Sequence, residues 1–212
     1  MHALVVTGYH EKEAEFGHDV TQYYEGRGLG SDRHIDFYAV RDNQGSSVVA
    51  TPKVDEEIRA YVASRNPPDL ILDVHVGAAD LFGKPRRIDE SYEAIDIDCK
   101  CVPRPVVYRL CQVLGQEHVF SDIVFPRELE EPPELASAHG MAESEESFEQ
   151  EFDETIAQTG LPTIIVEPYL FMKSVTSKDR CYWKRVRQTA RLINTVYDAF
   201  ESHGTQLPPP GD

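Results

Sequence analysis

Hydrophobic residues along the chain fall into short continuous runs separated by polar stretches. The runs at residues 3–9, 69–76 and 161–171 are apolar almost throughout, which predicts strands covered on both faces. Residues 34–40 and 46–51 are rich in β-branched and aromatic side chains, with Asn, Gln and Gly between them. These two segments predict a further pair of strands joined by a turn.

Other segments carry apolar residues at helical spacing. Residues 52–68 show this spacing up to Asn66 and two prolines, which predicts a helix that ends there. The same pattern predicts helices over residues 104–117 and 178–202, and we expect another near 147–158. Strands that alternate with helices predict an α/β layered fold with a largely parallel sheet.

Length and charge narrow the class of protein. The 212 residues suit a single domain, which we assign to residues 1–203, and residues 204–212 are expected to form a disordered tail. A net charge of -16 repels phosphate backbones, so we expect no nucleic-acid partner. No apolar run reaches about 18 residues and the first residues lack a secretory layout, which predicts a cytoplasmic protein with no membrane partner.

Charged residues are unevenly distributed. Residues 128–154 contain eleven acidic residues and no Lys or Arg, which predicts a surface loop that is either solvated or a lid over a crevice. Residues 173–191 contain seven Lys or Arg against one Asp. This basic stretch either binds an acidic partner or offsets the acidic loop, and the second interpretation is simpler.

The four cysteines are expected to be reduced thiols in such a protein. Cys99 and Cys101 are two positions apart, which is compatible with half of a structural zinc site. No second close pair of cysteines accompanies them, so a half-buried strand is the better interpretation.

The three apolar runs share one feature, because each ends at or near a side chain that binds metals or protons. His10 and Glu13 follow the first run, His75 ends the second, and Glu167 lies near the end of the third. Sites in open α/β sheets form beyond the carboxyl ends of strands, so these residues can converge. Two histidines and one glutamate, with a fourth position for water, are an established ligand set for catalytic zinc. We therefore predict Zn²⁺ bound by His10, Glu13 and His75.

Ordinary structural roles compete with this interpretation. His10 is alternatively a loop histidine, Glu13 a solvated carboxylate, and His75 a hydrogen-bonded core residue. Asp73 lies two positions before His75, on the same side of a strand, and can orient that histidine by a hydrogen bond. Glu167 is costly to bury alone, so it either faces the crevice or pairs with an arginine.

Three segments together resemble a known group of enzymes. VVTGYHEKEAEFG, LILDVHVG and PTIIVEPYLF are similar to motifs of the zinc carboxypeptidase and succinylglutamate desuccinylase/aspartoacylase group. In that group a strand leads into a glycine and HxxE, a later strand carries the third zinc ligand, and a late strand bears the catalytic glutamate. The order of the motifs agrees over residues 3–171.

The resemblance implies a three-layer fold with a mixed sheet between helices, as in zinc carboxypeptidases and other phosphorylase/hydrolase-like proteins. It implies zinc held by His10, Glu13 and His75, with Glu167 as general base. The expected reaction is hydrolysis of an amide or peptide bond in a small acylated amino acid or peptide. The alternative is a binding or scaffold protein that keeps the fold without the chemistry.

The group grips its substrate carboxylate with an Asn-Arg pair that this chain lacks. Its place can be taken by Arg33, Arg41, Arg86 or Arg87. An arginine binds a carboxylate through two hydrogen bonds. We favour Arg86 and Arg87 because their segment, GKPRR, follows the third ligand.

Overall fold

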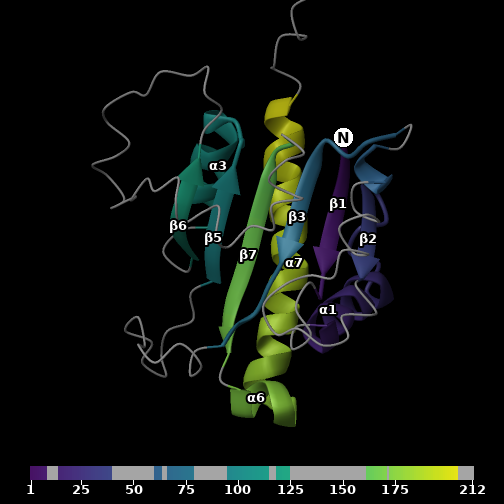
Figure 1. Ribbon diagram of the computed structural model, residues 1–212, viewed down its shortest axis with the longest axis vertical. Helices are drawn as coiled ribbons and strands as arrows, with labels where there is room; N and C mark the ends of the chain where they lie inside the picture. The colour runs from purple at the N-terminus through teal and green to yellow at the C-terminus, as the bar shows by residue number, and fades with distance from the viewer. Residues whose placement is uncertain are drawn as a thin grey trace, which may run out of the picture.

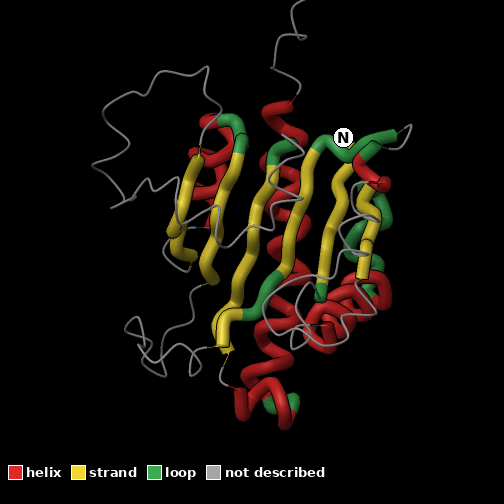
Figure 2. The backbone as a smooth tube through the Cα atoms, viewed as in Figure 1, coloured by secondary structure: helices red, strands yellow, loops and turns green. Residues whose placement is uncertain are grey.

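The computed structural model describes most of the chain, in eight segments: residues 1–8, 14–39, 60–63, 66–78, 95–114, 118–124, 161–170 and 172–204. Seven strands in these segments form one mixed sheet, in the order β2-β1-β3-β7-β5-β6, and β4 pairs with β7 (Figures 1 and 2). Their bounds are β1 His2–Thr7, β2 His34–Ala39, β3 Leu70–Val74, β4 Gly77–Ala78, β5 Ile95–Lys100, β6 His118–Val124 and β7 Thr163–Leu170.

The sheet combines two strand directions. The pairs β2–β1, β1–β3 and β3–β7 are parallel, whereas β5 runs antiparallel to β7 and parallel to β6. The ends of β1 and β3 therefore lie side by side, whereas β7 continues beyond them to Leu170 (Figure 1). A mixed α/β fold with a parallel core is what the sequence predicts, and the structure confirms it.

In the described segments, four helices accompany the sheet: α1 Ala14–Gly26, α3 Arg104–Leu114, α6 Met172–Ser177 and α7 Arg180–Gly204. Helices α1, α3 and α7 lie on one side of the sheet, and α7 crosses behind its central strands (Figure 1). One helical turn at residues 60–62 lies on the other side, where Tyr61 contacts β1 and β2. A complete second helical layer stays a prediction, because the segments around this turn lie outside the described residues.

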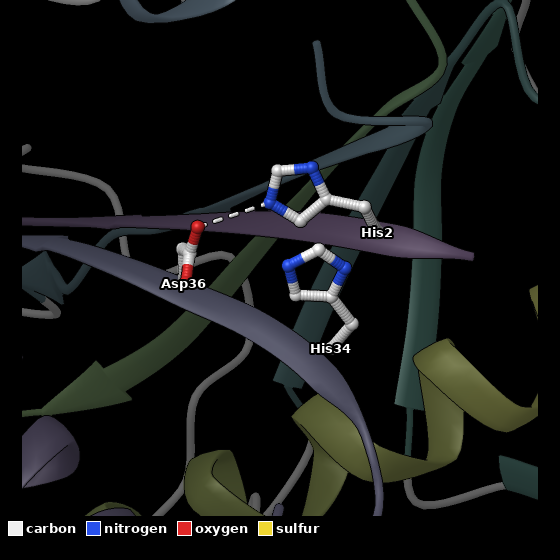
Figure 3. A group of neighbouring side chains, drawn as sticks. All are labelled: His2, His34 and Asp36. Atoms are coloured by element: carbon white, nitrogen blue, oxygen red, sulfur yellow. Dashed lines mark hydrogen bonds and ion pairs between the residues drawn. The ribbon is translucent and has the colours of Figure 1, made fainter. Parts of the chain in front are cut away.

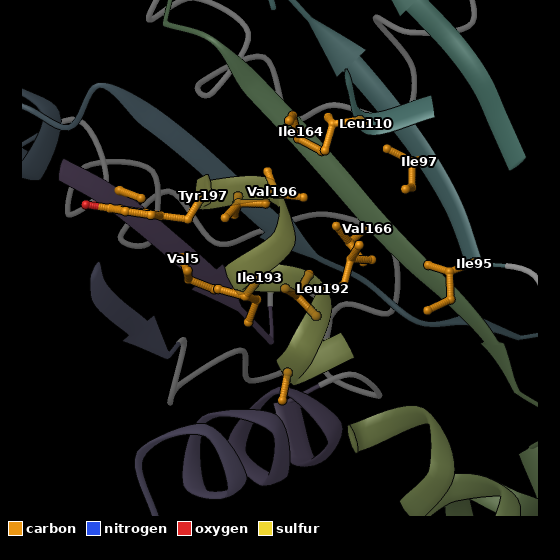
Figure 4. Packing of buried hydrophobic residues seen from close by; sticks show 14 of the residues in the cluster. Val5, Ile95, Ile97, Leu110, Ile164, Val166, Leu192, Ile193, Val196 and Tyr197 are labelled. Carbon is orange, nitrogen blue, oxygen red and sulfur yellow. The ribbon is translucent and has the colours of Figure 1, made fainter. Parts of the chain in front are cut away.

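The main hydrophobic core lies between the sheet and these three helices. Val5 and Val166 point into it from β1 and β7, and Ile193 and Val196 enter it from α7 (Figure 4). Leu72 of β3 belongs to the same cluster. Because side chains alternate along a strand, the residues between them face the opposite side. That opposite face is also buried, and it contains Leu4, Val6, Ile71, Asp73 and Ile165.

The chain leaves β1 through a tight connection to α1. Gly8 has a φ of 76°, a left-handed conformation that favours glycine. Gly17 of α1 packs against the end of β1, where an added Cβ would lie 2.6 Å from Cβ of Thr7 and 2.9 Å from the backbone nitrogen of Gly8. Glycine at position 17 thus lets the helix approach the strand end closely.

Most predicted elements are present, with shifted ends. The runs at 3–9, 34–40, 69–76 and 161–171 correspond to β1, β2, β3 and β7. The segment around Cys99 corresponds to β5. The helices predicted over 104–117 and 178–202 are α3 and α7, the latter beginning at Arg180 and ending at Gly204. The strand at 46–51, the helix at 147–158 and the acidic loop lie outside the described residues. Helix α1 and strand β6 were not predicted.

Candidate functional site

The candidate site begins where β1 and β3 end together and where the pairing of β3 with β7 stops, although β7 itself continues to Leu170. Thr7 of β1 pairs with Val74 of β3, and Val74 pairs with Val166 of β7. The next position along β1 is Gly8, the next along β3 is His75, and the next along β7 is Glu167. Ligands of open α/β sheets bind beyond the carboxyl ends of strands, so His75 and Glu167 lie at the edge where a ligand site is expected.

His75 is held by Asp73, which lies two residues earlier on β3. Nε2 of His75 lies 2.8 Å from Oδ2 of Asp73. An ionised carboxylate can only accept hydrogen bonds, so the N–H at Nε2 donates a hydrogen bond to this oxygen. Both residues are buried, with exposed fractions of 8% for His75 and 2% for Asp73. The bond fixes the orientation of the imidazole ring and leaves Nδ1 as the nitrogen with a lone pair.

The surroundings of the Asp73 carboxylate indicate that a cation can be accommodated next to His75. Its second oxygen, Oδ1, is buried and has no hydrogen-bond partner among the described residues. A buried carboxylate with one unpartnered oxygen is costly, and a positive charge close by offsets that cost. A histidine that binds zinc usually donates its other ring N–H to a carboxylate. The His75–Asp73 pair therefore fits a zinc ion held at Nδ1.

Glu167 lies beside His75 on the neighbouring strand. The pairing of β3 with β7 stops after Val74 and Val166 and resumes in the same register at Gly77 and Tyr169. His75 and Glu167 thus occupy the same level of the sheet, and side chains at one level of a parallel pair point to the same face. Glu167 is half-buried. A partly solvated carboxylate next to a histidine suits proton transfer.

Pro168 accounts for the interruption between β3 and β4. The backbone nitrogen of His75 donates to the Val166 carbonyl at 3.0 Å. In this parallel register the next donor would be the nitrogen of residue 168, and proline has no N–H. The ladder is therefore broken directly after His75, next to Glu167.

Four predicted site residues lie outside the described residues: His10, Glu13, Arg86 and Arg87. Their predicted roles are not tested by the structure. The described residues on either side of His10 and Glu13 are Gly8 and Ala14, at the end of β1 and the start of α1. Arg33, a weaker candidate for binding a substrate carboxylate, is engaged elsewhere, because its guanidinium donates to Asp198 at 2.9 Å.

Sequence reasoning missed a second buried acid on the same face. Asp98 of β5 is 3% exposed and pairs with Ile165 of β7, which lies two residues before Glu167. Burial, and then the charge of Asp98, raises the pKa of the adjacent Cys99 thiol well above its usual range. Cys99 is therefore an inert buried thiol. The alternation in IDIDCK is the signal that an acid lies on this face.

The cysteines form no disulfide with one another. All four lie in the described part of the chain and are free thiols. Cys99 is buried, whereas Cys101 lies just beyond β5 at a φ of 54°, so the two are not equivalent positions of one strand face. The interpretation of this segment as a strand is confirmed.

The chain was compared with protein families, curated proteins and solved structures, and similarity was found among the solved structures. No family model matches the chain, and no curated protein matches it. Among solved structures, those of murine aminoacylase 3 and of a point mutant of it are similar, each with a TM-score of 0.43 and 13% sequence identity. Each match covers 92% of this chain and 65% of the aminoacylase chain, so this chain spans about two-thirds of its length. A similarity at this level does not establish a family.

A helix can span a membrane only if it is long enough and apolar enough. Within the segments that the structure describes, no helix combines the length and apolar character needed to cross a bilayer.

Proposed function

We propose that this protein is a zinc-dependent hydrolase that cleaves an amide or peptide bond of a small acylated amino acid or peptide. The observation that carries the proposal is the buried His75–Asp73 pair, which lies at the end of β3, beside the end of β1 and beside Glu167 of β7. The resemblance of the three motifs to zinc carboxypeptidases and aspartoacylases supports it. The proposal includes the three-layer arrangement of that group.

In this proposal, His10, Glu13 and His75 hold the zinc ion. Asp73 keeps the proton of the His75 ring on Nε2, so that Nδ1 is the nitrogen that binds the metal. Its negative charge also increases the basicity of the ring. When bound, zinc polarises a carbonyl group and lowers the pKa of water to about 7.

Glu167 is the proposed general base. Its carboxylate accepts a proton from the attacking water and passes it to the nitrogen of the leaving amine, so that one carboxylate serves both steps. Its position level with His75, on the same face of the sheet, supports this role. Arg86 and Arg87 are proposed to bind a substrate carboxylate through paired hydrogen bonds.

The first experiment measures zinc and turnover in the same samples. Protein purified without added metal is analysed for zinc and then assayed on a panel of N-acylated amino acids and short peptides. We expect one zinc ion bound tightly enough to survive purification, and hydrolysis that a chelator abolishes. A His75→Gln variant should lose both.

The second experiment separates metal binding from proton transfer. Glu167→Gln keeps the size and polarity of the side chain but removes its basicity. We expect this variant to retain the zinc and to lose about 10²–10⁴-fold in turnover. Unchanged turnover would remove Glu167 from the mechanism. Protein that binds no zinc and hydrolyses none of the panel would instead support a non-catalytic binding or scaffold role.

A further inference from the structure

A second cluster of potential metal ligands lies at the opposite end of the sheet. His2 is the first residue of β1, and His34 and Asp36 lie on the neighbouring strand β2 (Figure 3). His2 pairs with His34 in the parallel register, and Leu4 pairs with Asp36. All three side chains therefore point to the same face, and the backbone register itself brings them together.

The side chains of the cluster are in close contact. Nε2 of His2 lies 3.1 Å from Oδ2 of Asp36, and the two imidazole rings stack with centroids 4.1 Å apart. One ligand atom from each residue lies within 4.8 Å of the other two. No other group of three such ligand atoms was found in the part of the chain that the structure describes.

Contacts around the cluster fix two of its members. The hydroxyl of Tyr61 donates to the same Asp36 oxygen that His2 approaches. The backbone nitrogen of His2 donates to Asp69 at 2.7 Å, and the Asp69 nitrogen donates back to the His2 carbonyl at 2.8 Å. His2 and Asp36 are thus positioned before any ion arrives, whereas His34 is exposed and able to turn.

This cluster is separate from the site at His75. His2 begins β1 and Thr7 ends it, and strands rise by about 3.3 Å per residue, so the two ends of β1 are roughly 16 Å apart. An ion bound at His2 therefore shares no ligand with the proposed catalytic zinc.

We infer that His2, His34 and Asp36 form a second Zn²⁺ site, which fastens the edge strand β2 to β1. Two imidazoles and one carboxylate are a set that zinc accepts, with water as the fourth ligand. Zinc bonds to nitrogen and oxygen of about 2.0–2.1 Å place neighbouring tetrahedral ligands a little over 3 Å apart. The distance between Nε2 of His2 and Oδ2 of Asp36 already matches this spacing.

Two changes accompany binding. The His34 ring turns out of its stack so that one of its nitrogens points at the ion. The His2 ring transfers its proton to Nδ1, because Nε2 must present a lone pair. Nδ1 is buried and has no hydrogen-bond partner among the described residues, and the absence of such a partner typically weakens zinc binding about 10–100-fold. We therefore expect a micromolar site that fills reversibly.

The test uses the full chain carrying His75→Gln, which removes the proposed catalytic zinc. Zn²⁺ is titrated into this protein by calorimetry, and Co²⁺ is added in parallel to detect the visible absorption of a tetrahedral site. We expect one equivalent of zinc to bind. Adding His34→Gln should weaken that binding at least tenfold and abolish the Co²⁺ spectrum.

The matched control is His18→Gln. His18 is an exposed histidine on α1, and among the described residues its side chain forms a hydrogen bond with Gln22. Zinc binding should be unchanged in this control. If the His75→Gln protein binds no zinc, or if His34→Gln binds as tightly as its parent, the inference is wrong and the cluster is held by hydrogen bonds and stacking alone.

The experiment remains decisive if His75→Gln does not fold. The wild-type chain should then bind two equivalents of zinc, of which His34→Gln removes the weaker one. Failure of the proposed hydrolase would show as loss of the tight equivalent and of turnover in the wild type. If this inference is wrong, only the weaker, micromolar equivalent of zinc will be missing, and the tight equivalent and turnover will remain. The two failures are therefore distinguishable.

Discussion

Leu72 and Asp73 are neighbours on β3, but their side chains enter different environments on the two faces of the sheet. Leu72 is fully buried in the core beneath α1, α3 and α7. Asp73 is almost as deeply buried on the other face, where one of its oxygens accepts a hydrogen bond from His75 and the other has no partner among the described residues.

The difference separates stability from function. On the helix-covered face, burial of apolar side chains stabilises the fold directly. On the other face, a buried carboxylate costs stability unless a positive charge accompanies it. In the proposed function, this second face is the one that carries the site residues Asp73, His75 and Glu167. Substitutions on the two faces should therefore have opposite signatures.

The largest effect on stability is expected for Leu72→Ala. Removal of this fully buried side chain should lower the free energy of unfolding by about 2–5 kcal/mol, through lost burial and the cavity left behind. Urea denaturation measures the change. Val113→Ala on α3 is the control, because Val113 is 48% exposed and its loss should stay within about 0.5 kcal/mol. The amount of zinc bound per folded molecule should not change. A loss of zinc in parallel with the loss of stability would contradict the assignment of separate roles to the two faces of the sheet.

Asp73→Asn should give the opposite pattern. We expect zinc affinity to fall about 10–100-fold, because the amide orients His75 less firmly and carries no charge. The metal-free protein should unfold at the same or a higher urea concentration, since a buried charge has become neutral. Competition with a coloured chelator measures the affinity. A loss of stability like that of Leu72→Ala, with unchanged zinc affinity, would make Asp73 an ordinary core residue.

Gly17→Ala tests the packing of α1 against the end of β1. Alanine inside a helix usually stabilises it by about 0.5–1 kcal/mol relative to glycine. At this position the new Cβ would meet Thr7 and the backbone of Gly8, so we expect a net loss of about 1–3 kcal/mol. Gly26→Ala, in the same helix with no atom within 4 Å of its Cβ, should be neutral or slightly stabilising. Equal effects of the two substitutions would contradict the close approach.

Tyr24 gives the helix-covered face its own response to pH. Burial raises the pKa of its hydroxyl to about 12, partly offset by Arg33. A raised pKa means that the folded protein holds this proton more tightly than the unfolded chain, so stability is complete below about pH 10 and falls towards pH 12. Tyr24→Phe should remove this part of the alkaline loss, while costing about 1 kcal/mol at neutral pH through its lost bond to Asn194.

Denaturation of both proteins at about pH 8 and about pH 11 measures this response. The difference in stability between wild type and Tyr24→Phe should shrink or reverse at the higher pH. Tyr61, Tyr182 and Tyr197 also have raised pKa values, mainly because of burial, so both proteins should retain some alkaline loss. An unchanged difference would show that Tyr24 titrates normally.

The central strands were predictable because a strand buried on both faces needs a nearly continuous apolar run. Helix α1 was not, because its sequence AEFGHDVTQYYEG contains a glycine and a buried acid, Asp19, at positions that face the core. Asp19 is satisfied there by Tyr182 and Lys178, which come from more than 150 residues later in the chain. Contacts of this kind leave no local signal in the sequence.

The candidate site was predictable to the extent that it depends on strand ends. Polar residues that end apolar runs indicated the edge where β1, β3 and β7 meet, and the two-residue spacing indicated the Asp73–His75 bond. The cluster of His2, His34 and Asp36 was missed because it depends on which strands are neighbours and on their register. Neither property can be derived from the spacing of these residues along the chain.

The most direct test of the central claim is a crystal structure of the zinc-loaded protein, with anomalous diffraction data collected at the zinc absorption edge. We predict a strong peak about 2.0–2.1 Å from Nδ1 of His75, with His10 and Glu13 as its other protein ligands and Glu167 close by. A map without a peak at His75, with His10 and Glu13 directed to solvent, would contradict the account.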